Sequence, residues 1–301
     1  MSDPGPLGAF LASRRAQLRP SDVGLVDYSE RRRVPGLRRE EVAQLAGVGF
    51  SYYSRLEQGQ SLNASPDVLD AIARALRFTD VERRHLHTLA RSPRRGPARV
   101  RSAPERMAQE TVHLLAAMGD APALVLGRRN DVLAWNRCGH ALFAGHLPLE
   151  APRRADTRPN MARLVFGDPH VRDLYADWPA KARAVVGNLR LLVGDDPEDP
   201  ALRELVGALS IESAQFAQLW ADHRVRDCDI AEYTMRHPLV GELTVTQQTL
   251  AVPLAPGQRL VVATAATGSD AAVSLALLAH LVSAAPGGPA ALDELAGLGG
   301  F

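Results

Sequence analysis

Cysteine and lysine are almost absent from this chain of 301 residues. The two cysteines, Cys138 and Cys228, are too few for a disulfide framework or a cysteine-based zinc site. We expect both to be buried thiols, with a redox switch between them as an open alternative. Lys181 is the single lysine among 35 basic residues. In a chain rich in Ala, Gly and Pro, this indicates a high-GC codon bias rather than a function.

Long apolar runs and targeting segments are also missing. No stretch of about 20 uncharged apolar residues occurs, so no membrane span is expected. The N-terminal residues, MSDPGPLGAF, lack the basic and apolar segments of a secretory signal. We therefore expect the protein in the cytoplasm, with no membrane partner.

Catalytic signatures are missing too. The sequence contains no G-x-S-x-G, no H-E-x-x-H, no P-loop and no G-x-G-x-x-G. His85 and His87 lie two residues apart on an expected helix, so they face different directions and make a poor metal pair. The sequence predicts neither an enzyme nor a metal site, although an enzymatic second domain stays as a rival interpretation.

Charge is distributed unevenly along the chain. Residues 1–100 hold 17 arginines against 11 acidic residues, a net charge of +6, whereas the remaining residues have a net charge of −5. The length favours two domains, and the apolar content of 46% is sufficient for folded cores. A basic front and an acidic back fit a nucleic-acid-binding module joined to a domain of another kind.

Residues 36–59 have the pattern of two short helices joined by a tight turn. Val42, Leu45 and Ala46 recur at helical spacing, and Gly47 suits the residue after a helix end, where φ is positive. The second helix is expected over residues 50–58, with an apolar back and short polar groups near its N-terminus. A helix of this kind suits the major groove of DNA.

Neighbouring helices complete an all-α domain of five helices. An amphipathic helix begins near Leu7, another is capped by Ser65 with Pro66 at its first position, and a capping box at residues 79–82 opens the fifth. The three arginines at 31–33 form either a solvated loop or an arm that contacts phosphate, and both interpretations stay open.

The helix, the glycine turn and the S-x-x-x-R-L-E-x-G pattern at residues 51–59 resemble the helix-turn-helix of the lambda/434 repressor-like (XRE) family. The resemblance implies binding to double-stranded DNA. Its matching positions place base contacts on the second helix and phosphate contacts at the start of the first; the DNA-facing residues are Arg38, Arg39, Gly49, Phe50, Ser51, Tyr52 and Arg55. Gly49 and Phe50 depart from the polar residues frequent there, which leaves the base preference open. Glu57 is expected to be structural, because a carboxylate facing DNA would repel phosphate.

The rest of the chain is expected to form a second domain. Residues 91–101 are basic and rich in Pro and Gly, and they indicate a linker. We therefore predict a DNA-binding domain at residues 1–91, a linker at 92–103, a second domain at 104–285 and a flexible tail at 286–301.

The second domain changes from strands to helices and back. Strands are expected at residues 123–126 and 132–135, and helices follow, including one at 179–193 that Gly194 closes. Three later strands precede a final helix capped by Ser269; they are expected at 229–236, 242–252 and 259–266. An antiparallel sheet assembled in this way is α+β.

Three stretches of this domain resemble the MmyB-like ligand-binding domain of actinobacterial regulators. They lie at residues 163–190, at SAQFAQLW (213–220) and at HPLVGELTV (237–245), within a resemblance that spans about residues 104–270. The resemblance implies a PAS-like fold and a small-molecule ligand such as a fatty acid. No other cofactor is expected.

Nine residues are candidate ligand contacts. An apolar cavity is expected from the aromatic residues Trp135, Phe143, Phe166, Tyr175 and Trp178. A ligand carboxylate is expected to meet Arg158, Asn160, Arg172 or Arg190. Plain core packing and surface solvation are the alternative roles of these side chains.

Together these features predict a transcriptional regulator. One domain offers a single recognition helix, so we expect a homodimer on an inverted-repeat operator, with a ligand that modulates DNA binding. The alternative is a DNA-binding regulator whose second domain dimerises or binds a protein partner without a ligand.

Overall fold

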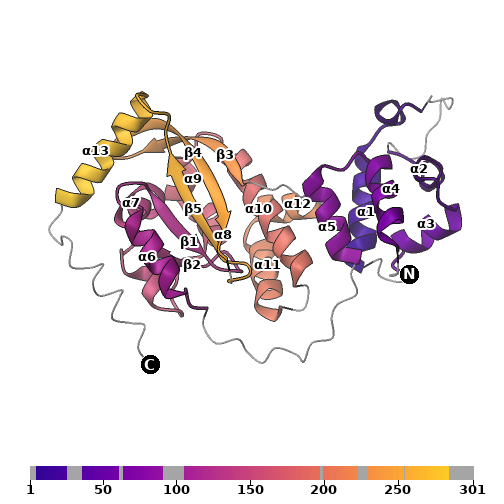
Figure 1. Ribbon diagram of the computed structural model, residues 1–301, viewed down its shortest axis with the longest axis horizontal. Coiled ribbons are helices and arrows are strands. Elements are labelled where there is room, and N and C mark those ends of the chain that lie inside the picture. Colours follow the sequence, from indigo (N-terminus) through magenta and orange to yellow (C-terminus); the bar gives the residue numbers. More distant parts are fainter. Residues whose placement is uncertain are drawn as a thin grey trace. The chain divides into compact units, whose positions relative to one another are not determined.

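The computed structural model describes residues 5–25, 36–60, 64–90, 105–196, 199–222, 229–253 and 255–284 (Figure 1). The predictions for the arginines at 31–33, the linker, the tail and Cys228 lie outside these residues. The chain divides into two compact units. Unit 1 comprises Met1–Ala98, Val186–Arg203 and Ala217–Asp227, and unit 2 comprises Arg99–Val185, Glu204–Phe216 and Cys228–Phe301. This division differs from the predicted ranges, because two segments of the second half group with the N-terminal helices.

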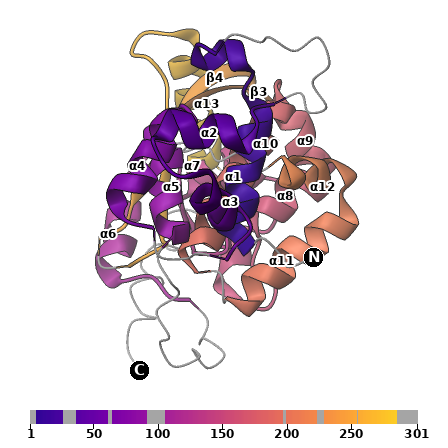
Figure 2. The same cartoon turned by 90° about the vertical axis from the view of Figure 1, so that its right-hand side faces the viewer.

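The N-terminal part of unit 1 is a bundle of five helices (Figures 1 and 2). They are α1 (Gly5–Gln17), α2 (Arg39–Ala46), α3 (Phe50–Glu57), α4 (Pro66–Ala75) and α5 (Asp80–Ala90), with a 3-10 turn at Pro20–Val23. All five predicted helices are confirmed. Gly47 ends α2 with φ of 66°, as the turn between the two short helices requires.

Apolar residues at helical spacing form the core of this bundle. Its fully buried members include Phe10, Tyr53, Leu56 and Ile72. Local caps fix the helix ends. Ser65 Oγ accepts a hydrogen bond from the backbone N–H of Val68 at the start of α4. The capping box of α5 is confirmed, because the N–H of Thr79 donates to Glu82 and the N–H of Glu82 donates to Thr79.

Two segments from the second half of the sequence belong to unit 1. Helix α10 (Trp178–Asp195) contributes its residues from Val186 onward, and Leu191 packs against the core of the bundle. The prediction that Gly194 closes this helix is wrong, because α10 runs through Gly194 to Asp195. A Cβ on Gly194 would lie 2.5 Å from Cε1 of His85. Close packing, rather than helix termination, therefore accounts for this glycine.

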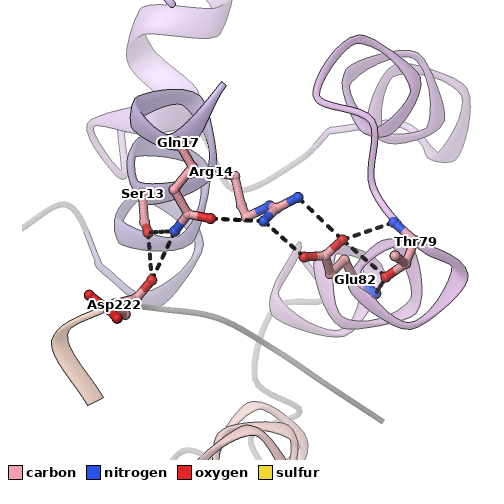
Figure 3. A network of polar contacts seen from close by, with 6 residues as sticks. All are labelled: Ser13, Arg14, Gln17, Thr79, Glu82 and Asp222. Atoms are coloured by element: carbon pink, nitrogen blue, oxygen red, sulfur yellow. Dashed lines mark hydrogen bonds and ion pairs between the residues drawn. The ribbon is translucent and has the colours of Figure 1, made fainter. Parts of the chain in front are cut away.

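Polar contacts join α1 to the end of α12 (Ala214–Ala221) within unit 1 (Figure 3). Ser13 Oγ and Gln17 Nε2 each donate to the backbone carbonyl of Asp222 at 3.0 Å. On the same helix, Arg14 Nη1 lies 3.2 Å from Glu82 Oε1. Through these contacts α1 is bonded both to α5 and to Asp222, directly after α12.

Unit 2 is built on a five-stranded sheet with the order β2-β1-β5-β4-β3. Every neighbouring pair is antiparallel. The strands are β1 (Ala123–Leu126), β2 (Val132–Trp135), β3 (Ile230–His237), β4 (Gly241–Ala251) and β5 (Arg259–Thr264). The first two strands have the predicted bounds, and the α+β class is confirmed. Asn130 makes the β1–β2 turn with φ of 64°, a backbone conformation that Asn tolerates.

Several helices complete unit 2. They are α6 (Gln109–Ala117), α7 (Arg137–Ala144), α8 (Met161–Gly167), α9 (Pro169–Leu174), the first part of α10, most of α11 (Pro200–Glu212) and α13 (Asp270–Ala284). Helix α13, yellow in Figure 1, contacts α7 and β4. Ser269 Oγ accepts from the N–H of Ala272 and caps this helix as predicted. Helix α9 contacts β3, and Tyr175, directly after α9, forms an isolated antiparallel β-bridge with Met235 of β3.

Candidate nucleic-acid interface and ligand-binding sites

Helix α3 presents polar and aromatic groups on one side and apolar groups on the other. Phe50 is 54% exposed, and Ser51 and Arg55 are exposed as well. Tyr52 is half-buried, whereas Tyr53 and Leu56 are fully buried in the core. Gly49 precedes the helix in extended conformation. The arrangement leaves the N-terminal end of α3 exposed to solvent, and the base contacts of this helix stay a prediction.

Glu57, at the end of α3, is held by two arginines from other helices. Arg15 donates from Nε to Glu57 Oε2 at 2.8 Å and from Nη2 to Oε1 at 2.9 Å, and Arg39 Nε donates to Oε1 at 2.8 Å. We call these three residues the Glu57 clamp. The Glu57 residue is only 2% exposed. The prediction that it is structural is confirmed, since its carboxylate joins α1 and α2 to α3.

The electrostatics of the clamp favour the ionised pair. Burial alone would raise the pKa of Glu57, but hydrogen bonds and charge from Arg15 and Arg39 outweigh it and hold the pKa below its ordinary value. The hydrogen bond to Glu57 raises the pKa of Arg15 against the opposing effect of burial. Arg15 also donates to the carbonyl of Leu37 at 2.7 Å. Sequence reasoning missed Arg15, although a carboxylate inside a DNA-facing helix signals that a cation lies nearby.

The two arginines predicted to meet phosphate lie at the start of α2. Arg39 contributes its Nε to the clamp, and its side chain keeps 40% of its surface exposed. Arg38 is the N-cap residue of α2, and its side chain is 43% exposed beside Glu40. Both side chains remain accessible to a phosphate, and the Glu57 clamp orients that of Arg39.

In unit 2, three of the predicted ligand residues gather in an aromatic cluster. The ring of Phe166 lies edge-on to Trp178 at 5.7 Å and to Phe216 at 5.0 Å. The guanidinium of Arg172 stacks over Trp178, with Cζ 4.2 Å from the ring centroid. Trp178 Nε1 donates to the carbonyl of Val165 at 2.7 Å. The cluster therefore includes Phe166, Arg172 and Trp178 of the predicted set, together with Phe216.

Tyr175, a fourth predicted residue, belongs to a cage around the single lysine. Lys181 Nζ lies 4.8 Å from the ring centroid of Tyr175 and 4.5 Å from that of Tyr233, and it donates to Gln247 Oε1 at 2.9 Å. We call these four residues the Lys181 cage. Lys181 is only 9% exposed, and among the described residues no carboxylate forms an ion pair with it. Sequence reasoning assigned Lys181 to codon bias and missed this environment.

The remaining predicted contacts have structural partners. Asn160 caps α8 and donates to the carbonyl of Arg129 at 2.7 Å, and Arg158 Nε donates to the carbonyl of Pro152 at 3.0 Å. These two residues border a cavity of about 710 Å³. Trp135 and Phe143 are buried, and Trp135 Nε1 donates to the carbonyl of Leu149.

Arg190 groups with unit 1. Its guanidinium stacks over Trp220 at 4.3 Å and donates to the carbonyl of the same residue. Burial lowers the pKa of Arg190 to about 10. Its stacking partner, Trp220, is not one of the predicted ligand residues.

A second cavity of unit 2, of about 590 Å³, contains none of the nine predicted contacts. Four histidines line it: His140, His146, His170 and His237. Arg137 and Glu150 add charge, and Leu149, Leu239 and Leu281 add apolar surface. We call it the histidine cavity. These histidines come from α7, the loop after it, α9 and β3, so they do not form a motif that is recognisable in the sequence.

Comparison with known families agrees with this architecture. A model of a helix-turn-helix domain matches residues 6–86, and a model of the MmyB-like transcription regulator ligand binding domain matches residues 107–278, more than half of the chain. The chain belongs to the MmyB-like regulator family. It is a DNA-binding transcription regulator with a ligand-sensing domain. No curated protein matches the chain.

The segment with the MmyB-like match extends beyond unit 2. It includes Val186–Arg203 and Ala217–Asp227, which cluster with the helix-turn-helix part in unit 1. Within the described ranges, no helix of this MmyB-like regulator is long and apolar enough to cross a membrane. In the same ranges, no three His, Cys, Asp or Glu side chains are grouped to hold a metal ion.

Proposed function

We propose that the chain binds an inverted-repeat operator as a homodimer and that a small apolar acid, such as a fatty acid, modulates this binding. The observation that carries the DNA-binding part is helix α3, whose exposed residues Phe50, Ser51 and Arg55 are held on a fixed support by the Glu57 clamp. Because one domain has one recognition helix, two copies are needed to read two half-sites.

Two segments of the MmyB-like match, Val186–Arg203 and Ala217–Asp227, group with the N-terminal helices in unit 1. They support a link between ligand binding and DNA binding. Residues of the MmyB-like match contact α1 directly, since Asp222 accepts hydrogen bonds from Ser13 and Gln17 (Figure 3). A ligand that shifts α10 or α12 therefore acts on the same unit that carries α3. Reciprocity then requires that a ligand which weakens operator binding also binds less tightly to the operator complex.

The test begins with selection of binding sites from random double-stranded DNA, followed by footprinting. The expected result is a two-fold footprint with half-sites about 10 bp apart, or a multiple of that spacing. A single asymmetric half-site occupied by a monomer would contradict the dimer. Operator affinity is then measured with medium- and long-chain fatty acids, and tryptophan fluorescence reports their binding. Constant operator affinity despite ligand binding would refute the regulatory part.

The second candidate function, dimerisation without a ligand, has its own observation. Helix α13 exposes Val273, Leu277 and Leu281 at four-residue spacing, with 67%, 47% and 42% of their surfaces accessible. An apolar stripe on a helix favours contact with another protein surface. A Val273→Asp/Leu277→Asp variant that turns the dimer into a monomer in sedimentation equilibrium, with no ligand binding by the parent protein, would favour this candidate.

A further inference from the structure

The histidine cavity combines an apolar wall with imidazoles whose bonding is incomplete. Its volume of about 590 Å³ lies within the range of small-molecule sites. Leu149, Leu239 and Leu281 form part of the apolar wall. The hydrogen bonds of each imidazole show which rings are already satisfied by the protein and which still have a nitrogen for a ligand.

His237 is satisfied by the protein itself. Its Nε2 lies 3.0 Å from the carbonyl of Ala141, which can only accept, so Nε2 carries the proton. Its Nδ1 accepts from the backbone N–H of Leu239 at 3.3 Å. Protonation of Nδ1 would break that bond, and burial already lowers the pKa of His237. This ring therefore stays neutral, and its two hydrogen bonds hold it in place in the wall of the cavity.

The other three rings each retain at least one nitrogen without a hydrogen bond to the described residues. His140 donates from Nε2 to the carbonyl of Leu147 at 2.7 Å, and its Nδ1 has no such partner. His146 donates from Nε2 to Asp168 Oδ2 at 2.8 Å. His170 stacks on His146 with ring centroids 4.2 Å apart, and neither of its nitrogens is bonded within the described chain.

The fixed charges of the lining, Arg137 and Glu150, are opposite in sign, so the imidazole N–H groups decide between an anion and a cation. Arg137 is the fixed positive charge of the lining, and Glu150 is the fixed negative charge. Asp168 and Asp173 are further carboxylates that act on His170, and Asp168 is already bonded to His146. A metal cation would require grouped ligands, which the described residues do not provide. An acid instead gains N–H donors from imidazoles.

We propose that the histidine cavity is the ligand site of this domain and that it takes a compact amphipathic acid. The apolar body lies against Leu149 and Leu239, and the anionic group accepts hydrogen bonds from His170 and from His140 after Nδ1 takes up a proton from solvent. This inference rests on the proposed ligand-sensing function and names the site and the ligand chemistry for it.

Such a site predicts that binding tightens as pH falls. Burial lowers the pKa values of His140 and His170, so both rings are neutral in the empty cavity at neutral pH. Glu150 and His146 act on His140 with opposite signs, and His146, His237, Asp168 and Asp173 act on His170. A bound anion raises both pKa values. Affinity therefore increases as pH falls through the pKa values that the two histidines have in the complex. It levels off below the pKa values that they have in the free protein.

The test uses 8-anilinonaphthalene-1-sulfonate, an apolar molecule whose sulfonate stays ionised, in fluorescence titrations of the full chain. Binding is expected to be about fivefold or more tighter at about pH 6 than at about pH 8. The His140→Gln/His170→Gln variant should weaken binding at the lower pH by about tenfold and abolish the pH dependence. His113→Gln is the matched control, because His113 is exposed on α6 and, among the described residues, bonds only to Gln109. Retained near-UV circular dichroism shows that each variant is folded.

A charge pair at one position provides an independent measurement. Leu239 is exposed at the rim, so both Leu239→Glu and Leu239→Arg are expected to fold. The glutamate should weaken probe binding and the arginine should strengthen it, each by about threefold or more. Equal binding by both variants, or a pH dependence that persists without His140 and His170, would overturn the assignment. If fatty acids still change operator affinity in the double-histidine variant as they do in the parent, the cavity assignment fails while the proposed function stands. If operator affinity never responds in the parent, the regulatory function fails regardless of probe binding.

Discussion

Each unit holds a cation of low exposure, Arg15 in unit 1 and Lys181 in unit 2, and stabilises it in a different way. In unit 1 the Arg15 guanidinium forms two hydrogen bonds with the buried carboxylate of Glu57. In unit 2 the ammonium of Lys181 lies between two tyrosine rings and bonds to an amide oxygen. The clamp is a pair of opposite charges, so removal of one partner leaves the other uncompensated. The cage has no countercharge among the described residues, so an apolar side chain can replace its cation without leaving a buried charge behind.

The largest effect is expected from Glu57→Gln. Arg15, whose side chain is 16% exposed, would lose its buried carboxylate partner, and breaking a buried ion pair in this way costs about 3–5 kcal/mol. Urea denaturation followed by circular dichroism measures this loss in the free energy of unfolding. Glu40→Gln is the matched control, since the Glu40 side chain is 64% exposed and should change stability by less than about 0.5 kcal/mol.

The same substitution has a defined pH dependence. Because the pKa of Glu57 is held low in the folded state, its stabilisation is present above the unfolded pKa and is lost as pH falls through the folded value. The difference in unfolding free energy between parent and Glu57→Gln should therefore shrink below about pH 4. A difference that stays constant down to acid denaturation would show that the clamp is not ionised.

Arg55→Ala should affect DNA binding without affecting the clamp. Arg55 is exposed on α3, so its loss should cost about 1–3 kcal/mol on the selected operator and relax base preference at one position. Binding to a set of single-base operator variants measures this, and unchanged unfolding separates it from Glu57→Gln. A uniform loss across cognate and random DNA would show that the docking of α3 is wrong.

Arg39→Ala tests the exposed arginine of the Glu57 clamp. Loss of this side chain should weaken binding to cognate and random DNA alike, and it should reduce the salt dependence of binding by about one unit. Because Arg39 is 40% exposed and Arg15 remains on Glu57, the cost to stability should be about 1 kcal/mol or less. A change in base preference here, with none in Arg55→Ala, would reverse the roles assigned to the two arginines.

The smallest effect is expected from Lys181→Met. The variant removes a desolvated charge but leaves Gln247 without its ammonium partner, so the net change in unfolding free energy should be about 1 kcal/mol in either direction. Urea denaturation beside Glu57→Gln gives the direct comparison. A loss as large as that of Glu57→Gln would mean that Lys181 has a countercharge outside the described residues.

Local sequence patterns determined the secondary structure of both units. The Thr79–Glu82 capping box, the caps at Ser65 and Ser269, and the two strands at residues 123–126 and 132–135 follow from residues only a few positions apart. Such features depend on neighbours along the chain, which the sequence displays directly. Gly194 shows the limit of this reasoning. Its position suggested a helix end, but the glycine serves a close approach to His85, far away in the sequence.

Only the tertiary structure decided which polar groups meet. Arg15 and Glu57 are 42 residues apart, and Lys181 and Gln247 are 66 apart. The histidine cavity likewise draws rings from two helices, a loop and a strand end. Pairings of this kind depend on sheet register and helix packing, which carry no periodic signal in the sequence. The sequence by itself therefore established a helix-turn-helix domain followed by an α+β domain. Folding decided that Glu57 anchors the recognition helix and that four histidines line one cavity, because these side chains come from segments that meet only after the cores have packed.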